Sequence, residues 1–182
     1  MSRINLVTKD TANADQSELL DAIQAKLGTV PNFLKVLANS PAALRAFLGL
    51  YAIAETGSLD PKTRERIAVS IAQGNSCEYC LSAHTAIGRK AGLSNAELEA
   101  NRAGGSLEAK AAGAVAFARA LNEHLGEVTQ AELDAVRKAG YGDAEIVEVI
   151  AHVGMNILTN LVGKASQVDI DFPKVSLRKA AA

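Results

Sequence analysis

Helical start and stop signals follow one another along most of the chain, and they constrain the fold more than any other feature. Asp60 precedes Pro61, a capping residue followed by proline at the first helical position, and the segment after them runs to Gly74. Ser94, with Glu97 three residues later, has the spacing of a capping box. No segment shows the alternation of apolar and polar residues that is typical of a half-buried strand. The sequence therefore predicts an all-α protein.

The same signals predict where the other helices begin. Pro31 and Pro41 each stand where a helix can start, and Ser76 is placed to cap a helix that ends before Gly92. Asp143 is expected to open the last long helix. The predicted helical ranges are about 31–39, 41–56, 61–74 and 76–91, with a further long helix from 143.

Length and composition fit a single domain with a buried core. Of the 182 residues, 48% are hydrophobic, 21% are charged and only 4% are aromatic, which favours closely packed helices over a β-sandwich. We expect one helical-bundle domain over 1–182, with an N-terminal arm at 1–16 and a C-terminal tail at 172–182.

Charge and hydropathy make several classes of partner unexpected. Nineteen basic and twenty acidic residues give a net charge of -1 without a basic block, so neither nucleic acid nor an anionic membrane is expected. The most apolar late segment is interrupted by Glu148, His152, Asn156 and Asn160, which makes it a poor membrane span. The first residues lack the apolar run of a signal peptide, so we expect a cytoplasmic protein.

The two cysteines and one of the histidines stand close together, as Cys77-x-x-Cys80-x-x-x-His84. On a helix, Cα atoms three residues apart are separated by about 5 Å, within the window of about 4.4–6.8 Å for a disulfide. His84, four residues after Cys80, is nearer to that thiol than to Cys77. Cys77 would lie in the first turn, where free N–H groups and the helix dipole favour a thiolate.

Glu65 is the expected fourth member of this group. If 61–74 and 76–91 fold back as an antiparallel hairpin about residue 75, Glu65 comes to lie opposite His84. A carboxylate on an otherwise apolar helix face needs a partner, and the imidazole is the nearest candidate. Glu65, His84 and a thiol would then form a proton relay, in which the carboxylate orients the imidazole.

Other interpretations of these residues remain open. Cys77, Cys80 and His84, with Glu65 or water, are also a possible zinc ligand set, although the chain has no second cysteine pair. The cysteines could also be small buried hydrophobes on a helix. His152, Asn156 and Asn160 form a polar stripe that would either line a substrate approach or bond within the core or across a subunit interface. Glu65 could instead form a surface pair with Lys62, and His84 could be a hydrogen-bonded core histidine.

Glu65 followed by Cys77-x-x-Cys80-x-x-x-His84 on a helical hairpin resembles the core of alkylhydroperoxidase D, in the carboxymuconolactone decarboxylase-like superfamily. The segment 59–94, LDPKTRERIAVSIAQGNSCEYCLSAHTAIGRKAGLS, carries the resemblance most specifically. The total length and the string EIVEVIAHVGMNILTN are similar to the peroxidase-related branch of that superfamily. The resemblance implies an all-helical fold that assembles as trimers or hexamers.

It also implies a cofactor-free and metal-free thiol peroxidase acting on hydrogen peroxide or small organic hydroperoxides. In that scheme Cys80 attacks the peroxide, and Cys77 resolves the sulfenic acid as a disulfide and then meets a dithiol or protein reductant. Glu65 and His84 relay protons. Tyr79 departs from the pattern, because the best-known members carry a relay histidine just before the second cysteine. The alternatives are a decarboxylase-like enzyme of the same superfamily, a redox sensor and a metal-binding protein.

Overall fold

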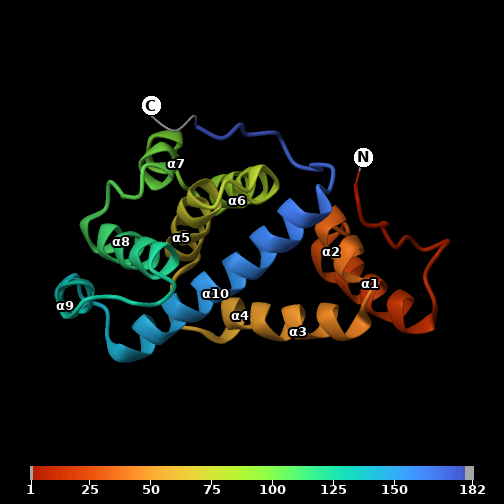
Figure 1. Cartoon of the computed structure of the whole chain (residues 1–182), viewed down its shortest axis with the longest axis horizontal. Coiled ribbons are helices and arrows are strands. Elements are labelled where there is room, and N and C mark those ends of the chain that lie inside the picture. The colour runs from red at the N-terminus through yellow and green to blue at the C-terminus, as the bar shows by residue number, and fades with distance from the viewer. Residues whose placement is uncertain (1, 179–182) are drawn as a thin grey trace.

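The computed structural model describes residues 2–178, and this part of the chain contains helices and no strand (Figure 1). The all-α prediction is therefore confirmed. In chain order the helices are α1 (Ala14–Leu27), α2 (Asn32–Leu37), α3 (Pro41–Tyr51), α4 (Ile53–Thr56), α5 (Pro61–Gly74), α6 (Glu78–Lys90), α7 (Asn95–Arg102), α8 (Ala109–Glu123), α9 (Gln130–Lys138) and α10 (Asp143–Ser166).

The long helix α10 divides the molecule, with α1 to α3 on one side and the α5–α6 hairpin and α7 to α9 on the other (Figure 1). Val149 and Val153 of α10 belong to the core that α10 shares with α5, α8 and α9. Met155 belongs to the core that α10 shares with α1, α2 and α3. By length and composition alone α10 would also suit a membrane span, but here it is the central helix. One helix therefore joins both cores.

The start of α5 is formed as its sequence predicts. The Asp60 side chain accepts a hydrogen bond of 3.0 Å from the Thr63 amide, and Pro61 occupies the first helical position. The buried face of α5 includes Ile67 and Ile71, both fully buried. At the other end, α5 stops at Gly74 and leads directly into the turn before α6.

The start of α6 corrects one expectation. Ser76 is not the cap: it adopts a left-handed conformation with φ of 54° and turns the chain between the two helices. The cap is Cys77, whose Sγ accepts a hydrogen bond of 3.3 Å from the Cys80 amide. Because Ser76 forms the tight turn, the N-cap of α6 is the next residue, Cys77.

Two other expectations need smaller corrections. The single helix expected at 41–56 is two helices, α3 and α4, divided at Ala52. Ser94 does cap α7, but the Glu97 carboxylate does not return to it and accepts instead from Arg66 Nε at 2.8 Å, inside the protein. A buried arginine competes better for that carboxylate than an exposed backbone amide does.

Within the described residues, the segments at both ends lie against the helical body. Helix α1 begins at Ala14, inside the range expected for the arm. After α10 the chain continues without regular structure, and we call residues 167–178 the C-terminal strap. Val168 of the strap is buried in the hydrophobic cluster around the cysteines, and Phe172 and Leu177 pack against that cluster. Residues 179–182 of the expected tail lie outside the described residues.

Candidate redox site

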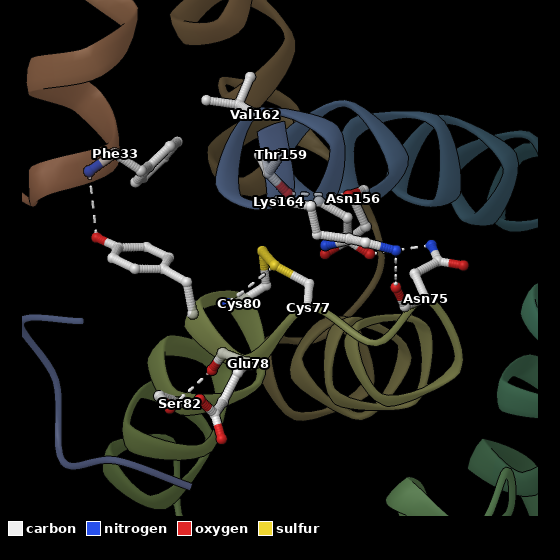
Figure 2. The surroundings of a disulfide bond; sticks show 12 residues. Phe33, Asn75, Cys77, Glu78, Cys80, Ser82, Asn156, Thr159, Val162 and Lys164 are labelled. Atoms are coloured by element: carbon white, nitrogen blue, oxygen red, sulfur yellow. Dashed lines mark hydrogen bonds between the residues drawn. A yellow bond between two sulfur atoms is a disulfide. The ribbon is translucent and has the colours of Figure 1, made fainter. Parts of the chain in front are cut away.

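Cys77 and Cys80 form a disulfide at the start of α6 (Figure 2). Their Cα atoms are 5.4 Å apart, close to the separation expected for positions i and i+3 of a helix. Both residues are buried, with 1% and 4% of their surface exposed. The pair thus has the Cα separation that a disulfide at the start of a helix needs.

Helix α10 forms the wall that faces the two sulfurs, and Figure 2 shows Asn156, Thr159 and Val162 on this side. Gly163 of α10 lies against both sulfurs. A Cβ atom built there would lie 3.1 Å from Cys77 Sγ and 3.5 Å from Cys80 Sγ. A glycine at this position lets α10 lie directly against the disulfide, and no side chain stands between them.

Glu65 of α5 and His84 of α6 meet across the hairpin, as their register predicts. His84 Nδ1 lies 2.8 Å from Glu65 Oε2, and the two side chains are 20% and 15% exposed. A carboxylate oxygen is the acceptor in this pair, so Nδ1–H donates and Nε2 is the ring nitrogen left for another partner. The hairpin therefore orients the imidazole of a residue that lies one helical turn from Cys80 along α6.

Tyr79, between the cysteines, is an anchor and not a proton carrier. Its hydroxyl donates to Asp171 Oδ1 at 2.8 Å and accepts from the Phe33 amide at 3.3 Å. Burial first, and then the Asp171 carboxylate, raises the pKa of Tyr79 far above its usual range. The phenol stays protonated at any working pH, so this position cannot shuttle protons as a histidine would.

The polar stripe of α10 is buried within the subunit, with His152, Asn156 and Asn160 each 2% exposed. Asn160 Oδ1 accepts from Asn75 Nδ2 at 2.9 Å, and Asn75 exchanges further hydrogen bonds with Asn122 of α8. These amides fix the turn that leads into the cysteines. The Asn160 end of the polar stripe therefore has a structural role.

His152 lies at the other end of the stripe, with its Nε2 buried and without a hydrogen-bond partner among residues 2–178. Burial, the largest cause, lowers its pKa to about 4, and the Arg64 charge acts in the same direction. Glu148 and Glu65 oppose that shift and His84 adds to it. His152 is therefore an uncharged imidazole at neutral pH.

The donor set of a metal site is not assembled in the described part of the chain. Among residues 2–178, no group of three or more His, Cys, Asp or Glu side chains is placed to hold a metal ion. The zinc alternative for Cys77, Cys80, His84 and Glu65 is not supported by this geometry.

The structure adds residues that the sequence analysis missed. For Gly163 the sequence held one clue, because a glycine inside an apolar helix can indicate that another element packs closely there. Asp171 and Asn75 had none, because each acts through a contact with a distant segment.

Comparison with known proteins supports the resemblance. Residues 41–123 match the model of the carboxymuconolactone decarboxylase family. No curated protein sequence matches the chain. An uncharacterized peroxidase-related protein from Silicibacter sp. TM1040 has 27% sequence identity and a TM-score of 0.79, covering 92% of this chain and 91% of that one.

Two further solved structures share the fold. The alkylhydroperoxidase AhpD core protein from Ralstonia eutropha JMP134, also peroxidase-related, has 23% identity and a TM-score of 0.82, over 93% of this chain and 92% of that one. The debrominase Bmp8, solved with 2,3,4-tribromopyrrole, has 17% identity and a TM-score of 0.78, over 92% and 91%. Residues 41–123 therefore match the carboxymuconolactone decarboxylase family, and the chain has the alkylhydroperoxidase D-like fold.

Proposed function

We propose that this protein is a thiol-dependent peroxidase that reduces hydrogen peroxide or small organic hydroperoxides. The observation that carries the proposal is the hydrogen bond of 2.8 Å between Glu65 and His84, one helical turn from Cys80 of a disulfide-forming pair. A carboxylate that orients an imidazole beside a thiol is an arrangement for activating that thiol as a nucleophile. No cofactor takes part in the proposed cycle.

In the first step, the Cys80 thiolate attacks the nearer oxygen of the hydroperoxide and the O–O bond breaks. The Cys80 sulfur becomes a sulfenic acid, and the departing alkoxide takes the proton that His84 received from the thiol. Glu65 stabilises the imidazolium that forms in between. The products of this step are one alcohol, or water from hydrogen peroxide, and one sulfenic acid.

In the second step, Cys77 attacks the Cys80 sulfur, the S–O bond breaks, and water leaves with the remaining thiol proton. Cys77 is suited to this role because its sulfur caps α6 and accepts the Cys80 N–H at 3.3 Å, which favours the thiolate. A dithiol or protein reductant then restores both thiols. The full cycle converts a hydroperoxide and two thiols into an alcohol, water and a disulfide.

Thiol titration of three proteins tests the proposal. The reduced wild type should lose two thiols after one equivalent of peroxide and recover both with dithiothreitol. Cys77→Ser should lose its one thiol and form a sulfenic acid that reacts with dimedone, whereas Cys80→Ser should consume no peroxide. Peroxide turnover by Cys80→Ser would reverse the roles of the cysteines, and survival of both wild-type thiols would end the proposal.

A bromopyrrole control separates this chemistry from that of the structurally similar debrominase. The same titration is run with 2,3,4-tribromopyrrole in place of peroxide, with release of bromide as the readout. Peroxide should oxidise the thiols and the bromopyrrole should not. Faster oxidation by the bromopyrrole would assign the dithiol to reductive dehalogenation instead.

We also propose that the protein works as a homo-oligomer, a trimer or hexamer, in the cytoplasm. An apolar stripe on α10 supports the association of copies. Val147, Ile150, Leu158 and Leu161 follow one another at helical spacing with 63%, 46%, 38% and 63% of their surface exposed. Apolar side chains so exposed along a helix of 24 residues are typical of a contact between subunits.

A further inference from the structure

The C-terminal strap runs along the first turn of the redox helix and contacts both residues between the cysteines. Lys174 Nζ lies 3.2 Å from the Glu78 carboxylate, and the Asp171 carboxylate accepts the Tyr79 hydroxyl. The Val175 amide donates to Ser82 Oγ at 3.0 Å, one turn further along α6. The strap therefore contacts this part of α6 at three places, through Asp171, Lys174 and Val175.

The contact between Asp171 and Tyr79 is held from a third element as well. Asp171 Oδ2 accepts from the Asn32 amide at 2.7 Å, at the start of α2, and the Tyr79 hydroxyl accepts from the neighbouring Phe33 amide. Phe172 packs edge-on against the Tyr79 ring with centroids 5.8 Å apart. Movement of Tyr79 must therefore disturb the strap, α2 or both.

Reduction of the disulfide needs room for the two sulfurs to move apart. Two bonded sulfurs are about 2 Å apart, whereas unbonded thiols need a separation of about 3.5–4 Å. On the α10 side the sulfurs already lie against Gly163, where there is no side chain that can rotate away. With α10 on one side, the sulfurs move apart towards the first turn of α6, which carries Glu78 and Tyr79 and is bounded by the strap.

We propose that the strap is a redox-linked clasp, closed on the disulfide through Tyr79 and Asp171 and loosened when the disulfide is reduced. Tyr79 and Asp171 are then positioning residues for the cysteine pair. Linkage makes the effect reciprocal: the factor by which the closed clasp favours the disulfide equals the factor by which the disulfide favours the closed clasp. The inference rests on the dithiol/disulfide cycle of the proposed function, but not on peroxide as the oxidant.

Equilibration with dithiothreitol tests the effect of the clasp on the cysteines. Dithiothreitol gives two electrons and two protons to the pair and becomes a cyclic disulfide, so the ratio of the two forms gives an equilibrium constant. Tyr79→Phe removes the hydroxyl and should shift this constant about tenfold towards the dithiol, equivalent to about 30 mV. Asp171→Ala should give a similar shift, and the double variant should shift it no further.

Arg178→Ala is the matched control. Its guanidinium binds the Glu99 carboxylate of α7 at 2.5 Å, at the far end of the strap from Tyr79, and its loss should leave the constant unchanged. An unchanged constant in a folded Tyr79→Phe protein, or an equal shift in Arg178→Ala, would overturn the clasp.

Hydrogen exchange in the unaltered protein tests the reverse effect. The Val175 amide should exchange about tenfold faster in the protein reduced with dithiothreitol than in the disulfide form. Equal protection in both forms would contradict the proposal, whatever the variants do. Neither measurement uses peroxide, so a failure of the peroxidase proposal and a failure of the clasp are distinguishable.

Discussion

Glu65 and His84 lie nineteen residues apart in the sequence, and the α5–α6 hairpin brings Glu65 Oε2 to 2.8 Å from His84 Nδ1. The two side chains come from different helices and face each other because the connecting turn is short. Since the carboxylate holds Nδ1–H, the second ring nitrogen is the one available to a thiol or a peroxide. The proposed chemistry depends on this relationship.

Removing either partner should slow the attack on peroxide. We expect His84→Gln to lower the rate constant for thiol oxidation about 100-fold, as for loss of a general base, and Glu65→Gln to lower it about tenfold. Because the two act as one unit, the double variant should be no slower than His84→Gln. Stopped-flow measurement of thiol loss gives these rates.

Glu18→Gln, an exposed carboxylate on α1, serves as the control for loss of a charge. Unchanged rates in Glu65→Gln and His84→Gln would reduce the pair to a structural role. Effects that multiply in the double variant would show that the two residues act separately.

Gly163→Ala should impair the cysteine pair. The added Cβ would lie 3.1 Å from Cys77 Sγ, so α10 or the first turn of α6 must shift, at a cost of about 1–3 kcal/mol in the free energy of unfolding. Gly49→Ala on α3 is the matched control, since nothing lies within 4 Å of its Cβ, and alanine there should stabilise by about 0.5–1 kcal/mol. Urea unfolding of both variants measures the difference, and equal stabilisation would show that α10 is not in close contact with the sulfurs.

Acid should destabilise the protein in a window set by His152. Its folded pKa of about 4 lies below the value of 6.5 for a free histidine. Above pH 6.5 both states are uncharged and nothing is lost. Between pH 6.5 and about pH 4, His152 is protonated in the unfolded chain but not in the folded one. The free energy of unfolding therefore decreases as the pH is lowered through this range. The total loss is about 3 kcal/mol at 1.36 kcal/mol per unit.

The check is the free energy of unfolding measured by urea between pH 7 and pH 4. His152→Gln should flatten the fall in this window, whereas His124→Gln, an exposed histidine at the end of α8, controls for the loss of a histidine. A wild-type profile that His152→Gln leaves unaltered would mean that His152 is charged in the folded protein.

Association of copies should depend on the exposed apolar stripe of α10. A charge at Leu161, which is 63% exposed, would be buried in any contact made by this face, so Leu161→Glu should lower the mass of the particle. Leu125→Glu, at an 88% exposed leucine between α8 and α9, is the control. Light scattering after gel filtration measures the mass. Identical oligomers for Leu161→Glu and wild type would place the interface elsewhere.

The local predictions that succeeded depend on interactions between near neighbours in the sequence. Asp60 caps α5 because its side chain and the Thr63 backbone amide lie three residues apart. The prediction that Glu65 lies opposite His84 was confirmed for a related reason. Two regular helices joined by a short turn have a register that can be counted from the turn.

The predictions that failed did so where a distant partner competed with a local one. Glu97 has the spacing of a capping box, but Arg66 and the 106–107 loop segment take its carboxylate. Serine is a preferred capping residue, but the α5–α6 turn requires Ser76 to adopt a left-handed backbone conformation. In both cases the packing of one helix against another decided the outcome.

The sequence by itself determined the helical class, the hairpin and the four residues of the candidate site, because repeat spacing and turn position are encoded within short segments. Tertiary structure alone decided that Cys77 caps α6, that Gly163 lies against both sulfurs, and that Asp171 holds Tyr79. The last two contacts join residues more than 80 positions apart, and they depend on where α10 crosses the hairpin and where the chain goes afterwards. No local pattern specifies a crossing point, since it follows from how the side chains of all the helices fill the cores together.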